Sequence, residues 1–96
     1  MKFMAMCSSG LGSSFMVQMN IEKALKTIGA EGVEVDHADL GSVSPAEADM
    51  FFVGRDLENS VSAFNNVKIL NSIIDQDELV DKVREACDEL GIDHSA

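Results

Sequence analysis

The chain has 96 residues, of which 46% are hydrophobic and 25% charged, and its formal net charge is −10. This length and composition predict one globular domain over residues 1–96, with a single modest core. The acidic balance disfavours nucleic-acid binding and binding to anionic lipid, because either needs a basic face. We find no apolar run of membrane-spanning length and no secretory signal, so we expect a cytoplasmic protein that does not insert into the membrane.

The first part of the chain predicts a strand, a tight loop and a helix. Residues 1–6 form an apolar run broken only by Lys2, which predicts a buried strand over Lys2–Met6. From Phe15 to Ile28 one apolar stripe recurs at helical spacing, and Gly29 is placed to end the helix. The stripe consists of Val17, Ile21, Ala24, Leu25 and Ile28.

Strands and helices continue to alternate along the rest of the chain. Ser44–Glu47 has the capping-box pattern, with Pro45 at the first helical position. The other predicted elements are strands over Gly32–His37, Ala48–Gly54 and Val67–Leu70, a short helix over Asp56–Phe64, and an amphipathic helix over Asp77–Leu90 that Gly91 ends.

This alternation predicts an α/β fold of the Rossmann-like or phosphatase-like P-loop kind. We expect an open four-stranded parallel sheet in the order 2-1-3-4, with helices on both faces. In that order the chain adds the second strand on one side of the first strand and the third strand on the other side. This reversal of the strand order opens a crevice at the carboxyl ends of the first and third strands, where such sheets bind ligands. Cys7 lies at this crevice, and the loops near Asp36–Asp39 and at Gly54–Asp56 are expected to form its walls.

The candidate site is the string that joins the first strand to the first helix. Its glycines permit a tight turn and its serines are small, so backbone amides and the helix N-terminus can surround a phosphoryl group. None of the seventeen acidic residues lies within Met1–Ile21, which suits a doubly negative ligand. We therefore predict Cys7 as the nucleophile. The predicted phosphate-binding loop is Ser8, Ser9, Gly10, Leu11, Gly12, Ser13 and Ser14.

Other reactive residues receive more ordinary interpretations. Cys7 and Cys87 are far apart, without a CxxC or a histidine-rich pattern, so we expect neither a disulfide nor a metal site, and Cys87 is a packing residue on the last helix. His37 is expected to be a solvated loop residue rather than a proton shuttle. Arg55 either steers phosphate or pairs with acidic neighbours.

The two methionines after the loop, Met16 and Met19, are interpreted as adaptable core side chains rather than as a partner surface.

The segment from Cys7 to Lys23 resembles the start of enzyme IIB components of the sugar phosphotransferase system, in the lactose/cellobiose-like superfamily. The ascorbate-type IIB proteins are especially similar, because their cysteine-glycine-serine loop also runs into a methionine-rich helix. The resemblance is most specific over residues 4–25. It implies that a phosphohistidine of a IIA partner donates a phosphoryl group to Cys7, which passes it to the sugar transported by a membrane IIC partner, with no metal or organic cofactor. Only Cys7 and Ser8–Ser14 carry over, so the resemblance assigns no role to His37 or Arg55.

The same loop sequence also bears on three other enzyme or cofactor-binding functions and on one non-catalytic function. A low-molecular-weight phosphatase or arsenate reductase needs C-x5-R, but Ser13 stands where the arginine belongs. A dinucleotide-binding module lacks its third glycine, and a thioredoxin-like enzyme lacks its second cysteine. A non-catalytic anion-binding regulatory domain stays open as an alternative; it would bind phosphate without a covalent adduct.

Overall fold

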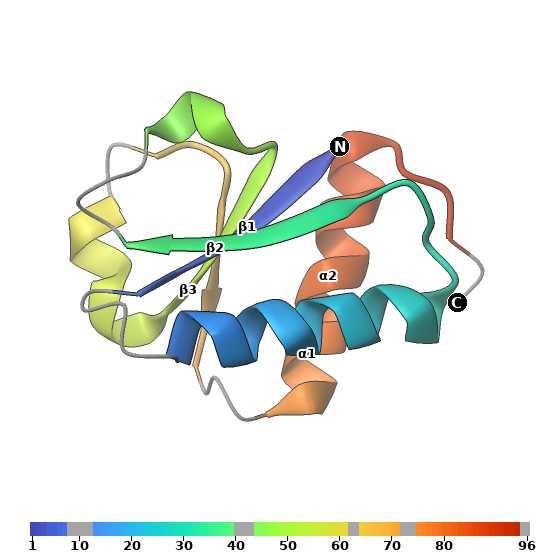
Figure 1. Cartoon of the computed structure of the whole chain (residues 1–96), viewed down its shortest axis with the longest axis horizontal. Helices are drawn as coiled ribbons and strands as arrows, with labels where there is room; N and C mark the ends of the chain where they lie inside the picture. Colours follow the sequence, from blue (N-terminus) through green and yellow to red (C-terminus); the bar gives the residue numbers. More distant parts are fainter. Residues whose placement is uncertain (8–12, 40–43, 62–63, 72–74, 95–96) are drawn as a thin grey trace.

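In the part of the chain that the structure describes, four parallel strands form one sheet in the order β2-β1-β3-β4 (Figure 1). This computed structural model describes residues 1–7, 13–39, 44–61, 64–71 and 75–94. The strands are β1 (Lys2–Cys7), β2 (Glu34–Asp39), β3 (Met50–Gly54) and β4 (Val67–Leu70). The predicted α/β fold and strand order are therefore confirmed.

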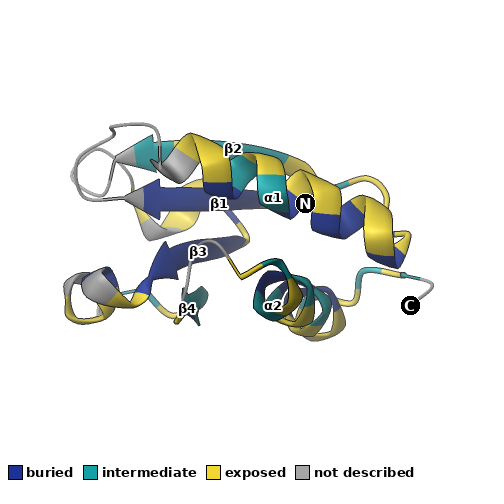
Figure 2. Cartoon of the chain, turned by 90° about the horizontal axis from the view of Figure 1, so that it is seen from below, coloured by how far each residue is buried: buried dark blue, intermediate teal, exposed yellow. Residues whose placement is uncertain are grey.

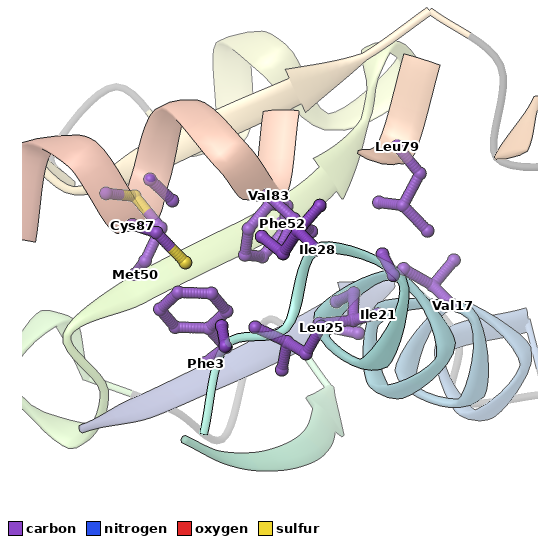
Figure 3. Packing of buried hydrophobic residues seen from close by; sticks show 14 of the residues in the cluster. Phe3, Val17, Ile21, Leu25, Ile28, Met50, Phe52, Leu79, Val83 and Cys87 are labelled. Atoms are coloured by element: carbon purple, nitrogen blue, oxygen red, sulfur yellow. The ribbon is translucent and has the colours of Figure 1, made fainter. Parts of the chain in front are cut away.

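Two α-helices cover one face of the sheet. They are α1 (Ser13–Ile28) and α2 (Gln76–Leu90), and their outer surfaces are exposed while their inner surfaces are buried (Figure 2). The predicted apolar stripe of α1 is buried along its whole length. Side chains from both helices meet Phe3 and Phe52 of the sheet in the larger core cluster (Figure 3). Burial of these side chains fixes how both helices lie on the sheet.

The opposite face of the sheet is covered by the 3₁₀ helix η3 (Arg55–Val61), while a second 3₁₀ helix, η2 (Pro45–Glu47), leads into β3. Leu57 and Val61 of η3 pack there against Met4, Met6, Phe51 and Val53 of the strands. The predicted short helix over Asp56–Phe64 is thus present as a 3₁₀ helix, over Arg55–Val61. The capping box is confirmed, because the backbone N–H of Ser44 donates to Oε2 of Glu47 at 2.7 Å and the reciprocal contact is also made.

The ends of the helices follow local sequence. Gly29 has φ 74°, and the next backbone N–H, that of Ala30, donates to the carbonyl oxygen of Leu25 at 2.9 Å, so the predicted stop after α1 is confirmed. At α2, Asp75 caps the first turn by accepting from the backbone N–H of Glu78 at 3.1 Å. Gly91 ends α2 in the left-handed conformation, with φ 71°. Neither helix, within the described ranges, has the length and apolar character that crossing a membrane requires.

Candidate functional site

The carboxyl ends of all four strands lie along one edge of the sheet, because the strands are parallel. β1 ends at Cys7, whose register partner is Asp39 at the end of β2. On the other side, Gly54 at the end of β3 pairs with Leu70 at the end of β4. Cys7 therefore occupies the edge at which ligands bind in open α/β sheets, as predicted.

The predicted phosphate-binding loop connects β1 to α1. Ser8, Ser9, Gly10, Leu11 and Gly12 lie outside the described residues. Ser13 and Ser14 are the first two residues of α1, which begins two residues earlier than predicted. The first turn of α1 carries no acidic residue, so the positive end of the helix dipole is not offset there by a carboxylate of its own turn.

The second strand was predicted too early. It spans Glu34–Asp39 rather than Gly32–His37, so the expected loop wall at Asp36–Asp39 is instead part of the sheet. Gly32, with φ 79°, lies in the turn before the strand. Pairing continues to the end of β1, where His37 is opposite Ala5 and Asp39 is opposite Cys7. Backbone hydrogen bonds to a neighbouring strand thus extend β2 through a polar segment.

His37 is consequently a strand residue that contacts α1, so its assignment to a loop was wrong, while the expected exposure of its side chain is confirmed. Its ring nitrogen Nδ1 is hydrogen-bonded to Oε1 of Gln18, and Nε2 of Gln18 donates to the carbonyl oxygen of Val35 at 3.1 Å. The ring also meets Phe15 edge-on, with centroids 5.5 Å apart. The side chain of His37 is 43% exposed. Nothing in the local sequence around His37 indicates this contact with α1.

Arg55 begins η3 directly after β3 and lies beside the end of β4. Its Nη1 donates to Oδ1 of Asn71 at 3.2 Å, and the Arg55 side chain is exposed. The backbone N–H of Asn71 in turn donates to Oε2 of Glu78 at 2.9 Å. The structure therefore shows Arg55 hydrogen-bonded to Asn71, at the end of β4. Neither of the two sequence interpretations, phosphate steering or pairing with acidic neighbours, included this partner.

The outer face of α1 next to the loop exposes large apolar side chains. Phe15 is 50% exposed, Met19 is 53% exposed and Met16 is 36% exposed. The interpretation of Met16 and Met19 as core side chains was therefore wrong. Further along α1, an open hollow is lined by Met19, Glu22, Lys23 and Lys26. The apolar stripe of α1 already fills the space toward the sheet, which leaves these methionines on the solvent side.

Cys87 is fully buried on α2 and belongs to the larger core cluster (Figure 3). It is a free thiol, and burial, with a smaller contribution from the charge of Asp88, raises its pKa above the usual value of 9.0. Both observations confirm a packing role and make Cys87 a poor nucleophile. Among the side chains that the structure describes, no three His, Cys, Asp or Glu residues gather to hold a metal ion.

Comparison with known proteins places this fold and loop in a family. The model for the family described as "PTS system, Lactose/Cellobiose specific IIB subunit" matches residues 2–82, which include every strand, α1 and the first half of α2. A search of curated proteins gave no match. Because the family match spans most of the chain, the resemblance of the segment Cys7–Lys23 to IIB components of the lactose/cellobiose-like superfamily is confirmed. The chain belongs to the lactose/cellobiose-specific IIB subunits, the phosphocarrier components of sugar phosphotransferase systems.

Proposed function

We propose that Cys7 accepts a phosphoryl group from a phosphohistidine of a IIA partner and passes it to the sugar that a membrane IIC partner transports. Residues 1–96 act in this relay as a single IIB domain in the cytoplasm. The observation that carries the proposal is the position of Cys7, the last residue of β1 at the ligand-binding edge of the sheet, in a chain of the IIB family.

The local chemistry supports a thiolate acceptor at this position. Phosphoryl transfer passes through a loose transition state, so the protein mainly has to position the reactants and stabilise charge on the phosphoryl oxygens. α1 begins six residues after Cys7, and the backbone N–H groups of its first turn have no acceptor within the helix, so they are of the kind that bind such oxygens. In the proposal, Ser8–Ser14 form this anion cradle, and no metal or organic cofactor takes part.

A phosphoryl relay fits this loop better than hydrolysis does. Ser13, the position at which a C-x5-R phosphatase loop has its arginine, is the first residue of α1. A serine has no guanidinium to clamp the equatorial oxygens while water attacks. The protein is therefore expected to hydrolyse p-nitrophenyl phosphate no faster than its Cys7→Ser variant.

The central test is phosphoryl transfer from a phosphorylated IIA protein, followed by peptide mass spectrometry. The wild-type chain is expected to gain one thiol-linked phosphoryl group on the peptide that contains Cys7. Cys7→Ser should lose it while keeping the circular dichroism spectrum of the folded protein. Cys87→Ala is the matched control, since Cys87 is buried in the core and should not affect uptake. Phosphorylation that persists in Cys7→Ser would contradict the proposal.

The transported sugar is tested separately. The likeness of the loop to ascorbate-type IIB proteins makes ascorbate the first substrate to examine. Membranes that contain the cognate IIC protein, supplied with phosphorylated IIA and this chain, should phosphorylate ascorbate in preference to lactose or cellobiose. A preference for either disaccharide would reject the ascorbate assignment and leave the relay through Cys7 untouched.

A further inference from the structure

A chain of hydrogen bonds determines which nitrogen of His37 carries its proton. The carbonyl oxygen of Val35 can only accept, so the amide group of Gln18 that faces it at 3.1 Å is the NH₂ group. The amide oxygen of Gln18 then faces Nδ1 of His37, and it also can only accept. Nδ1 must therefore be the donor. In neutral His37 the proton is on Nδ1, and Nε2 holds the lone pair.

Two separate contacts place His37 close to Cys7. On the sheet, His37 is the register partner of Ala5, and Cys7 is two residues further along the same strand. Spacings of parallel strands put the Cα atoms of His37 and Cys7 about 8 Å apart. On the helix side, the ring of His37 packs against Phe15, in the first turn of α1. The imidazole thus lies beside both the strand that leads to the candidate site and the helix that leaves it.

Charged groups lie near the imidazole on its own strand and on β1. Oδ1 of Asp36 accepts from the backbone N–H of His37 at 2.8 Å and lies 3.8 Å from Nδ1. Nζ of Lys2, on β1, is 3.8 Å from the other oxygen of that carboxylate. From α1, the ring meets the uncharged side chains of Gln18 and Phe15.

We propose that His37, held by Gln18 as the Nδ1–H tautomer, is the base that takes the thiol proton of Cys7 on Nε2. This step rests on the function proposed above. The sulfur keeps the electron pair of the S–H bond and attacks the phosphorus of the donor's phosphohistidine. The S–P bond forms as the P–N bond breaks, and the electron pair of that bond stays on the donor imidazole. This nitrogen then takes the proton from Nε2, which returns His37 to its neutral form. Gln18 is a positioning residue, because it acts through His37.

Alkylation of Cys7 tests the proton transfer without any partner protein. In a Cys87→Ala background, the rate of reaction with iodoacetamide reports the thiolate of Cys7. His37→Gln is expected to slow this reaction near pH 7 by about 100-fold, at the low end of general-base effects. The difference should close as the pH rises, since hydroxide then removes the thiol proton. His94→Gln, a change at the other histidine, beyond the end of α2, is the matched control and should leave the rate unchanged.

Phosphoryl uptake separates failure of this proposal from failure of the proposed function. Single-turnover transfer from phosphorylated IIA to His37→Gln should fall by a similar factor and recover at alkaline pH. Equal alkylation rates for wild type and His37→Gln at neutral pH would overturn the role of His37, even if Cys7 carries phosphate. Slower alkylation of Cys7 in His37→Gln, together with phosphorylation of a residue other than Cys7, would contradict the proposed relay through Cys7 and still support His37 as the base.

The tautomer of His37 distinguishes the proposed role from a purely structural contact between α1 and β2, because such a contact would not require the proton to be on Nδ1. Ring ¹⁵N chemical shifts of His37 should show Nδ1–H as the neutral form in the wild type. Gln18→Leu leaves the imidazole in place and removes the acceptor, so both tautomers should appear and alkylation of Cys7 should slow by a smaller factor than in His37→Gln. A wild-type spectrum dominated by Nε2–H would contradict the proposal, whether or not the His37 variant folds.

Discussion

The rings of Phe3 and Phe52 lie 5.4 Å apart, tilted by 48°, beneath both helices. Phe3 is on β1 and Phe52 on β3, and both are fully buried. Their contact joins the two central strands on the face that α1 and α2 cover, close to Leu25 and Val83 in the same cluster. This pair is therefore the centre of the larger core.

Phe52→Ala is expected to destabilise the protein by about 3–5 kcal/mol, because it removes a buried ring and leaves a cavity between closely packed elements. Urea unfolding followed by circular dichroism measures the change. Phe15→Ala is the matched control, and its loss should be below about 1 kcal/mol because the Phe15 side chain is half exposed. Similar losses in the two variants would contradict this description of the core.

Asp75→Ala should destabilise α2 by about 1 kcal/mol, because the backbone N–H of Glu78 then loses the carboxylate oxygen that accepts its hydrogen bond. Asp75→Asn should keep most of the stability, because the amide oxygen caps as well as a carboxylate does. Thermal unfolding of the three proteins tests this order. An asparagine variant as unstable as the alanine variant would show that charge, rather than the capping hydrogen bond, is what matters at this position.

Gly91→Ala should cost about 1 kcal/mol through the backbone alone. Gly91 has φ 71°, and a Cβ atom added there meets nothing within 4 Å, so the cost is the left-handed conformation and not a clash. Asparagine tolerates this conformation better than alanine, so Gly91→Asn should be the milder change. Differential scanning calorimetry gives the comparison. A larger loss for asparagine than for alanine would mean that side-chain size limits the position.

The stability of the protein should fall at alkaline pH, in part through Cys87. Burial raises the pKa of this thiol in the folded state above its usual value of 9.0. As the pH rises through that value, the unfolded chain loses the proton first and is favoured, so the contribution present at lower pH is lost. Urea unfolding at pH 7 and pH 10 measures the loss, which should be smaller in Cys87→Ala. An equal alkaline loss in both proteins would exclude this thiol as its source.

Much of the fold could be predicted because its signals are local. The buried stripe of α1 follows from the spacing of Val17, Ile21 and Leu25, and the stops at Gly29 and Gly91 follow from their ability to adopt positive φ. The strand over Val67–Leu70 was predicted with its observed bounds. The strand order followed from the alternation of elements, and the position of Cys7 followed from the strand order.

Contacts between distant segments decided the rest. β2 extends to Asp39 because β1 offers it hydrogen-bonding partners, although the local sequence there is polar. Met19 is exposed because the sheet and α2 meet only one side of α1, and helical periodicity alone does not show how wide that contact is.

The sequence by itself determined the two α-helices and their ends at Gly29 and Gly91, since each depends on residues within a few positions of one another. Only the tertiary structure brought Gln18 to His37, because their contact needs the strand pairing of β1 with β2 and the packing of α1 over both. It also placed Asp39 on the strand next to Cys7, although the chain around Cys7 has no acidic residue before Glu22. The charges near a site are set by all the strands that end there, and these come from separate parts of the chain.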